Sequence, residues 1–139
     1  MANQHAPGRF HILDLTSGLL PTALQSISFN TVISTEVIEH LYDPRSFLNF
    51  ARRILEKSDN GKLIISTPYH GYLKNLVMAI SGKMDAHHTV LWDGGHIKFF
   101  SKSTLEKMLS DQGFMATAFK GAGRMPWLWK SMLMSAVTK

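Results

Sequence analysis

The stretch "FNTVISTEVIEHLYDP", residues 29–44, joins a short apolar run to a group of ionisable side chains. Its first half, "NTVIST", is rich in β-branched residues and predicts a β-strand. Its second half carries Glu36, Glu39 and His40, and its final "DP" predicts the start of a helix, because proline is well tolerated in a first helical turn. A buried strand that runs directly into such side chains indicates either a ligand site at the strand's end or acids that face water.

Strands and helices alternate on both sides of this stretch. Apolar side chains recur at helical spacing from Phe47 to Leu55, and the turn residues "SDNG" (Ser58–Gly61) end that helix. The other elements that apolar patterning predicts are strands at Arg9–Leu15, Lys62–Thr67, Met115–Phe119 and Ser131–Val137, and helices at Tyr72–Gly82 and Ser101–Phe114. This alternation favours an α/β fold whose sheet is mostly parallel with a mixed edge at the end, and right-handed crossovers then place helices on both faces.

Length and composition narrow the classes of protein. The 139 residues predict a single domain, 1–139, and contain no cysteine, which excludes disulfides and thiolate metal sites and fits the cytoplasm. No apolar run approaches the length of a membrane span. The net charge is +5, but the basic residues are scattered and no nucleic-acid motif accompanies them, so we expect no nucleic-acid partner.

Polar side chains follow three of the predicted strands where each strand ends. Asp14 follows "HIL", Ser34–Glu36 follows "TVI", and Ser66 to His70 includes the polar side chains that follow "LII". Ligands of open α/β sheets bind beyond the carboxyl ends of the strands. The sequence therefore predicts a shared pocket at this edge of the sheet.

The order of motifs resembles the central and C-terminal part of class I S-adenosylmethionine-dependent methyltransferases. The matching pieces are "TEVIEH" (Thr35–His40) followed by "DP", the strand "LIISTP" (Leu63–Pro68), and "HIKFFSKSTLEKMLSDQGF" (His96–Phe114). The resemblance covers residues 30 to 119 and implies a truncated Rossmann-like methyltransferase sheet, mostly parallel with an antiparallel last strand. It makes "NTVIST" the family's fourth strand, "KLIIST" the fifth, and the last two runs the sixth and seventh.

The family's glycine-rich cofactor loop has no clear counterpart upstream, and two readings of "FHILDLTSGLLPTALQ" (Phe10–Gln25) remain open. In one it is the family's third strand, with Asp14 in the place of an acid that binds adenine. In the other it is a degenerate first strand, with "DLTSG" (Asp14–Gly18) in place of the glycine-rich turn. Both readings predict a strand before residue 16, and the shorter distance to residue 30 favours the first.

The resemblance implies roles for individual residues, with S-adenosylmethionine as cofactor. Ser34, Thr35 and Glu36 would border its methionine and ribose end, and Asp14 and Leu15 its adenine. The activity implied is methyl transfer to a small-molecule acceptor. The alternative is a non-catalytic, methyltransferase-like module that associates with another chain.

On the acceptor side, His40 is a candidate general base, since histidine titrates near neutrality. Alternatively, Glu39 and His40 form a polar helix start that braces a loop. The segment after the fifth strand shapes the acceptor pocket of the family, and its candidate residues here are Tyr69, His70, Trp92 and His96.

The sequence also bears on whether the protein binds a metal ion or a partner chain. Histidine and carboxylate side chains are frequent from residue 70 to 96, but their spacing matches no standard motif, so we expect no metal site. Missing upstream strands would leave an exposed sheet edge, which predicts a homodimer or a partner chain. The stretch "RMPWLWKSMLM" (Arg124–Met134) is amphipathic, but we expect it to pack on the core or a partner rather than on a membrane.

Overall fold

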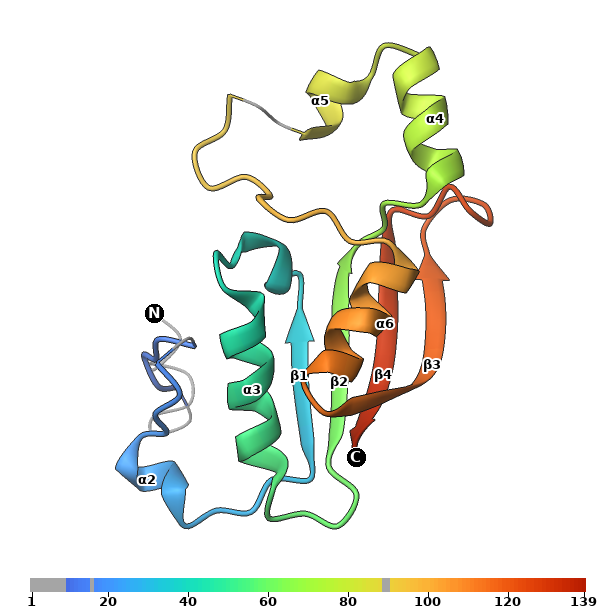
Figure 1. The fold of residues 1–139 in the computed structure, drawn as a ribbon. Coiled ribbons are helices and arrows are strands. Elements are labelled where there is room, and N and C mark those ends of the chain that lie inside the picture. The colour runs from blue at the N-terminus through green and yellow to red at the C-terminus, as the bar shows by residue number, and fades with distance from the viewer. Residues whose placement is uncertain (1–9, 16, 89–90) are drawn as a thin grey trace.

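A computed structural model of the chain describes residues 10–15, 17–88 and 91–139. The elements follow the order expected of an α/β protein (Figure 1). They are α2 (Thr22–Gln25), β1 (Thr31–Thr35), the 3-10 turn η1 (Ile38–His40), α3 (Pro44–Leu55), β2 (Lys62–Pro68), α4 (Tyr72–Ile80), α5 (Met84–His88), α6 (Lys102–Asp111), β3 (Phe114–Ala122) and β4 (Ser131–Thr138).

The four strands form one mixed sheet in the order β1-β2-β4-β3. β1 and β2 are parallel, with Ile33 opposite Ile64, whereas β4 is antiparallel to both β2 and β3. The last strand therefore runs against the other three, as expected. The expectation of a mostly parallel sheet is wrong for the described residues. Among them, β1 and β2 form the one parallel pair, and no further strand pairs with the free edge of β1. The other two pairings are antiparallel, because β4 lies between β2 and β3.

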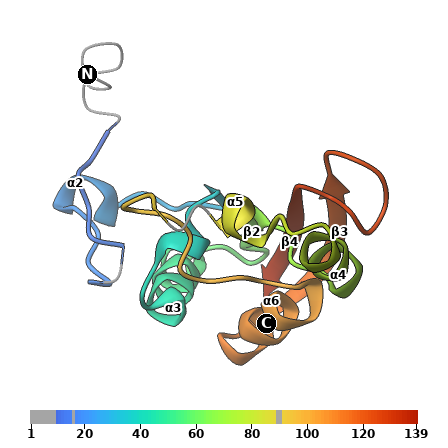
Figure 2. The ribbon, with the colours of Figure 1, turned by 90° about the horizontal axis from the view of Figure 1, so that it is seen from above.

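The hydrophobic core lies between one face of the sheet and the helices α3 and α6. Seen from above, both helices are on the same side of the strands (Figure 2). The fully buried side chains that meet there include Leu48, Leu55, Leu105 and Leu109 from the helices and Leu63, Ile65, Met132 and Met134 from the strands. Burial of such side chains is worth about 1.5–3 kcal/mol each relative to exposure, so this layer stabilises the whole sheet.

The opposite face of the sheet carries apolar side chains that no described helix covers. Ile33, Met115 and Leu133 are 65%, 55% and 38% exposed. Helices on both faces were expected, and the described residues contradict this. The reason is topological, because β1 to β2 and β2 to β3 step in the same direction along the sheet, and right-handed connections in one direction place their helices on one face.

Both core helices begin at side-chain caps. Asp43 Oδ1 accepts hydrogen bonds from the first-turn amides of α3, as the "DP" pair predicted. In α6 the capping box joins Ser101 and Thr104, whose hydroxyls accept from each other's amides at 3.3 and 2.9 Å. Ser101 has the extended backbone of a cap residue, with φ of -88° and ψ of 168°, and α6 begins at the next residue.

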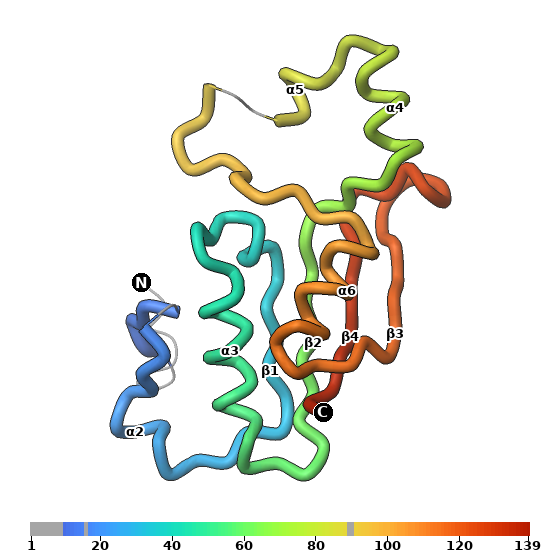
Figure 3. The backbone as a smooth tube through the Cα atoms, viewed as in Figure 1, coloured from blue at the N-terminus to red at the C-terminus, as the bar shows by residue number. Residues whose placement is uncertain are grey.

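The N-terminal segment runs beside α3 in the tube view (Figure 3) and contains the short helix α2. Residues 10–15 form no strand, so both readings of this segment predicted an element that is absent from its described part. Phe10 and Ile12 are exposed, and without hydrogen bonds to a neighbouring strand an extended run has no ladder to hold it. The helix α5 was missed, because a histidine-rich polar run carries no apolar period.

No helix among residues 10–15, 17–88 and 91–139 has both the length and the apolar character needed to span a bilayer.

Candidate functional site

Hydrogen bonds between Glu36 and Ser66 join the carboxyl ends of β1 and β2. The Glu36 amide donates to the carbonyl of Ser66 at 3.0 Å, and the Ser66 hydroxyl donates to Glu36 Oε1 at 2.8 Å. Glu36 adopts a left-handed backbone with φ of 51°, a conformation that a non-glycine residue keeps only when its surroundings hold it. The predicted convergence of these two strand ends is thus confirmed.

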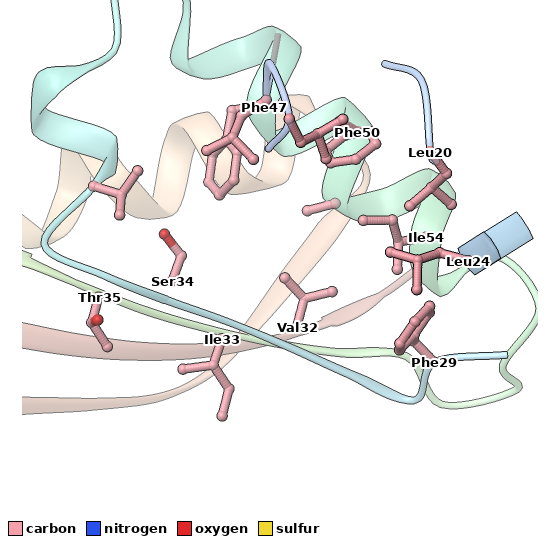
Figure 4. Close-up of a pocket in the computed structure, with 14 residues that line it drawn as sticks. Leu20, Leu24, Phe29, Val32, Ile33, Ser34, Thr35, Phe47, Phe50 and Ile54 are labelled. Atoms are coloured by element: carbon pink, nitrogen blue, oxygen red, sulfur yellow. The ribbon is translucent and has the colours of Figure 1, made fainter. Parts of the chain in front are cut away.

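An apolar cavity of about 420 Å³ lies beside β1 (Figure 4). Val32 and Ser34 point from the strand toward Phe47 and Phe50 of α3, whereas Ile33 points away. Of the predicted cofactor residues, Leu15, Ser34 and Thr35 line this cavity. The Ser34 hydroxyl is buried and has no hydrogen-bond partner among the described residues, so a ligand here could satisfy it.

The predicted glycine turn contributes Leu15 to this cavity, but its acid and its glycine do not line it. Arg53 of α3 donates a hydrogen bond from Nη1 to the carbonyl of Gly18 at 3.0 Å, and Ser17 donates to the carbonyl of Asp14 at 2.8 Å. Gly18 has φ of 70°, and a Cβ there would come within 3.0 Å of the Arg53 guanidinium. The turn is therefore fixed against α3, and neither Asp14 nor Gly18 is among the described residues that line the apolar cavity.

A second cavity, of about 510 Å³, is lined by His40, the last residue of the turn η1. Three predicted site residues meet in its wall, namely His40, Trp92 and His96, together with Tyr42. The rings of His40 and His96 contact edge to face with centroids 4.9 Å apart. Because Val37 lines the apolar cavity and His40 lines this one, the segment from Val37 to His40 borders both.

Glu39 holds this region together from inside the protein. Its side chain is fully buried, and Oε2 accepts a hydrogen bond from Thr67 Oγ1 at 2.9 Å. Its carbonyl accepts from the amides of Ile97 and Lys98, both at 3.0 Å. Glu39 therefore holds the loop through its backbone carbonyl and β2 through its side chain, but it does not form the start of α3, which begins at Pro44. Its complete burial was missed, because an acid in a helix-start motif ordinarily faces water.

The other two predicted acceptor residues lie outside this cavity. Tyr69 belongs to the core and packs edge to face on Trp129 with centroids 5.2 Å apart. His70 is 6% exposed and packs among the rings of His87, His88 and Phe99. Neither side chain is therefore part of the lining of the second cavity.

Burial changes the protonation of the side chains beneath the cavity. The pKa of His70 falls from 6.5 to about 4, because burial disfavours the imidazolium and the positive charge of Lys74 opposes it further. Burial also lowers the pKa of Lys74 from 10.5 to about 8. Lys74 donates from Nζ to the carbonyl of Tyr69 at 2.6 Å, a role that its position in an apolar helix did not reveal.

The depressed pKa of His70 predicts a dependence of stability on pH. Between pH 6.5 and about 4 the unfolded chain binds a proton at this histidine and the folded chain does not, so stability falls as the pH falls through that range. The variant His70→Gln lacks this titration, and we expect it to lose less stability than the wild type between pH 7 and pH 5. Urea unfolding at both pH values measures the difference, and equal losses would contradict the prediction.

Comparison with known proteins identifies the family. A family model described as a methyltransferase domain matches residues 3–118, most of the chain, and the chain belongs to this family. A comparison with curated proteins finds no match.

Solved structures confirm a methyltransferase-like fold. A magnesium protoporphyrin IX methyltransferase from Synechocystis with bound SAH aligns with a TM-score of 0.57 at 17% identity, over 91% of this chain and 49% of that one. An O-methyltransferase family protein from Burkholderia thailandensis aligns with a TM-score of 0.63 at 14% identity, over 94% and 35%.

A putative methyltransferase of Haloferax volcanii, solved in complex with a methyltransferase activator, aligns with a TM-score of 0.57 at 14% identity, over 80% of this chain and 54% of that one. The chain spans about half the length of the solved structures that head the comparison.

Proposed function

We propose that the chain takes part in S-adenosylmethionine-dependent methyl transfer to a small-molecule acceptor, with the cofactor at the carboxyl end of β1. The observation that carries the proposal is that the segment from Val37 to His40 borders a cavity on each side. The apolar cavity is the cofactor side and the cavity of His40 is the acceptor side. A reaction that joins two bound molecules needs such an arrangement, because proximity and orientation supply much of its rate.

The residues present fit part of the cofactor. Leu13, Leu15 and Ile54 form an apolar wall suited to adenine, and the unpartnered Ser34 hydroxyl lies beside it. Thr35 borders the same space, while Glu36 is bound to Ser66 at its rim. The described lining contains no glycine and no carboxylate, so the ribose hydroxyls and the amino-acid end of the cofactor receive little from it.

On the acceptor side, bound S-adenosylmethionine supplies an electrophilic methyl group, and this chain's residues orient the nucleophile. Trp92 and His96 form the wall against which an acceptor would lie, and His40 is placed to accept its proton. His70 contacts Phe99, which also lines this cavity, whereas Tyr69 packs in the core.

Calorimetric titration with S-adenosylmethionine and S-adenosylhomocysteine tests the proposal. We expect the wild type to bind both, and Ser34→Ala to bind about 2–10-fold more weakly, the equivalent of one neutral hydrogen bond. Ser135→Ala, a matched serine on β4 outside the cavity lining, serves as control and should bind as the wild type does. No heat and no thermal shift at millimolar ligand would contradict cofactor binding by this chain.

A second candidate function is a module that associates with a second copy of this chain. β1 has one neighbouring strand among the described residues, and its five residues carry no charge and no proline to protect the edge. An edge strand can pair with its own copy about a two-fold axis, and Ile33 adds exposed apolar surface beside it.

Light scattering over a wide concentration range tests this association. We expect a monomer at low concentration and a dimer at high concentration, and Ile33→Lys should shift the transition to higher concentration. Leu91→Lys, at an exposed apolar position far from β1 in sequence, is the control. A monodisperse monomer at every concentration would contradict the dimer.

A further inference from the structure

One oxygen of the buried carboxylate of Glu39 is unaccounted for. Oε2 accepts from Thr67, but Oε1 is buried and has no hydrogen-bond partner. A buried carboxylate oxygen is costly unless a hydrogen bond, a cation or a metal satisfies it. The orientation fixed by Thr67 leaves Oε1 facing His40, whose Nε2 lies 3.9 Å away.

A second histidine completes a cluster around this oxygen. The candidate ligand atoms of Glu39, His40 and His96 all lie within 4.8 Å of one another. The contact is built into the backbone, because the amides that follow His96, those of Ile97 and Lys98, both donate to the Glu39 carbonyl. The loop and the turn therefore bring the three side chains together independently of any ligand.

We propose that Glu39, His40 and His96 form a binding site for a divalent transition-metal ion, with Zn²⁺ as the ion that it holds most readily in solution. Two imidazoles and one carboxylate are a ligand set that Zn²⁺ and its first-row neighbours prefer, whereas Mg²⁺ and Ca²⁺ prefer oxygen alone. Ligand atoms around tetrahedral zinc lie ~3.4 Å apart, so binding draws these atoms together by ~1 Å, within the reach of rotations of partly exposed imidazoles.

The surroundings match those of a metal site with an open position. His40 and His96 line the cavity of about 510 Å³, so an ion between them faces that space. Three protein ligands then leave a fourth position for water or a small molecule. Thr67 acts as the outer-shell group that orients the carboxylate. An ion pair between Glu39 and His40 would also satisfy Oε1 of Glu39, but it would give His96 no role. Substitution of His96 therefore distinguishes a metal site from an ion pair.

The metal site shares His40 and His96 with the proposed acceptor cavity, and metal binding is tested here without any measurement of methyl transfer. Titration calorimetry of the full chain with Zn²⁺ should show one site, and Co²⁺ should give a visible absorption band typical of a low-coordinate nitrogen and oxygen environment. His96→Ala should weaken Zn²⁺ binding at least ~100-fold, because loss of an outer-shell group alone costs 10–100-fold. Thr67→Val should weaken Zn²⁺ binding by about 10–100-fold, because Thr67 is such an outer-shell group.

Control variants separate this site from adventitious binding to other histidines. His11→Ala and His88→Ala should bind Zn²⁺ like the wild type, since neither belongs to the cluster. Circular dichroism verifies that each variant is folded, and if Glu39→Gln does not fold, the partly exposed His96 still carries the test. Absence of Zn²⁺ binding by the wild type, or equal binding by His96→Ala, would overturn the proposal.

Discussion

Replacing Leu63 with alanine is expected to lower the free energy of unfolding by about 2–5 kcal/mol, the range measured for large-to-small changes in packed cores. Leu63 is fully buried in β2, the strand between β1 and β4, and belongs to the core that α3 and α6 cover. Covering helices lie on one face only, so this core is a single layer with no second layer to compensate for a cavity. Urea unfolding followed by circular dichroism measures the change.

The matched control is Leu91→Ala, which removes the same atoms from a side chain that is 99% exposed. Surface substitutions away from special features stay within about 0.5 kcal/mol. If the two variants lost equal stability, the assignment of Leu63 to the core would be wrong.

Thr67→Val is expected to cost about 3 kcal/mol although it changes the shape of the side chain very little. Thr67 is fully buried at the end of β2, and its hydroxyl donates the hydrogen bond to Glu39 Oε2. Without it both oxygens of a buried carboxylate are left without a hydrogen-bond donor among the described residues, and an unsatisfied charged group costs more than a lost neutral hydrogen bond.

Thr31→Val is the matched control, because Thr31 has the same chemistry on an exposed position of β1. Its unfolding free energy should stay within about 0.5 kcal/mol of the wild type. A double variant Thr67→Val with Glu39→Leu should recover part of the loss, since replacing both partners by apolar groups is far less costly than removing one. No recovery would show that the Thr67 effect comes from packing rather than from the hydrogen bond.

Local sequence signals predicted the central elements well. The β-branched run before residue 36, the "DP" helix start and the glycine after α6 each act through backbone geometry within a few residues. For this reason, and because the "SDNG" turn marked the end of α3, the elements β1, α3, β2 and α6 were predicted close to their observed bounds. The antiparallel last strand followed from the family resemblance and is confirmed by the register of β4.

Features that depend on residues far apart in the sequence could not be predicted from such local signals. The apolar pattern of residues 10–15 equals that of a strand, but whether it becomes one depends on a neighbour to pair with. The one-sided placement of α3 and α6 depends on the direction in which the connections cross the sheet. At the site, His40, Trp92 and His96 were predicted from the resemblance and meet in one cavity, whereas the orphan oxygen of Glu39 emerges only from the three-dimensional contacts.

We propose that the carboxyl edge of β1 binds the cofactor of a methyltransferase domain. Titration of the ¹⁵N-labelled chain with S-adenosylhomocysteine, followed by amide NMR, shows whether it does. We expect the largest shifts at Leu15, Ser34, Thr35 and Glu36, with small shifts across β3. Saturating shifts that centre on another surface, or none at millimolar ligand, would contradict it.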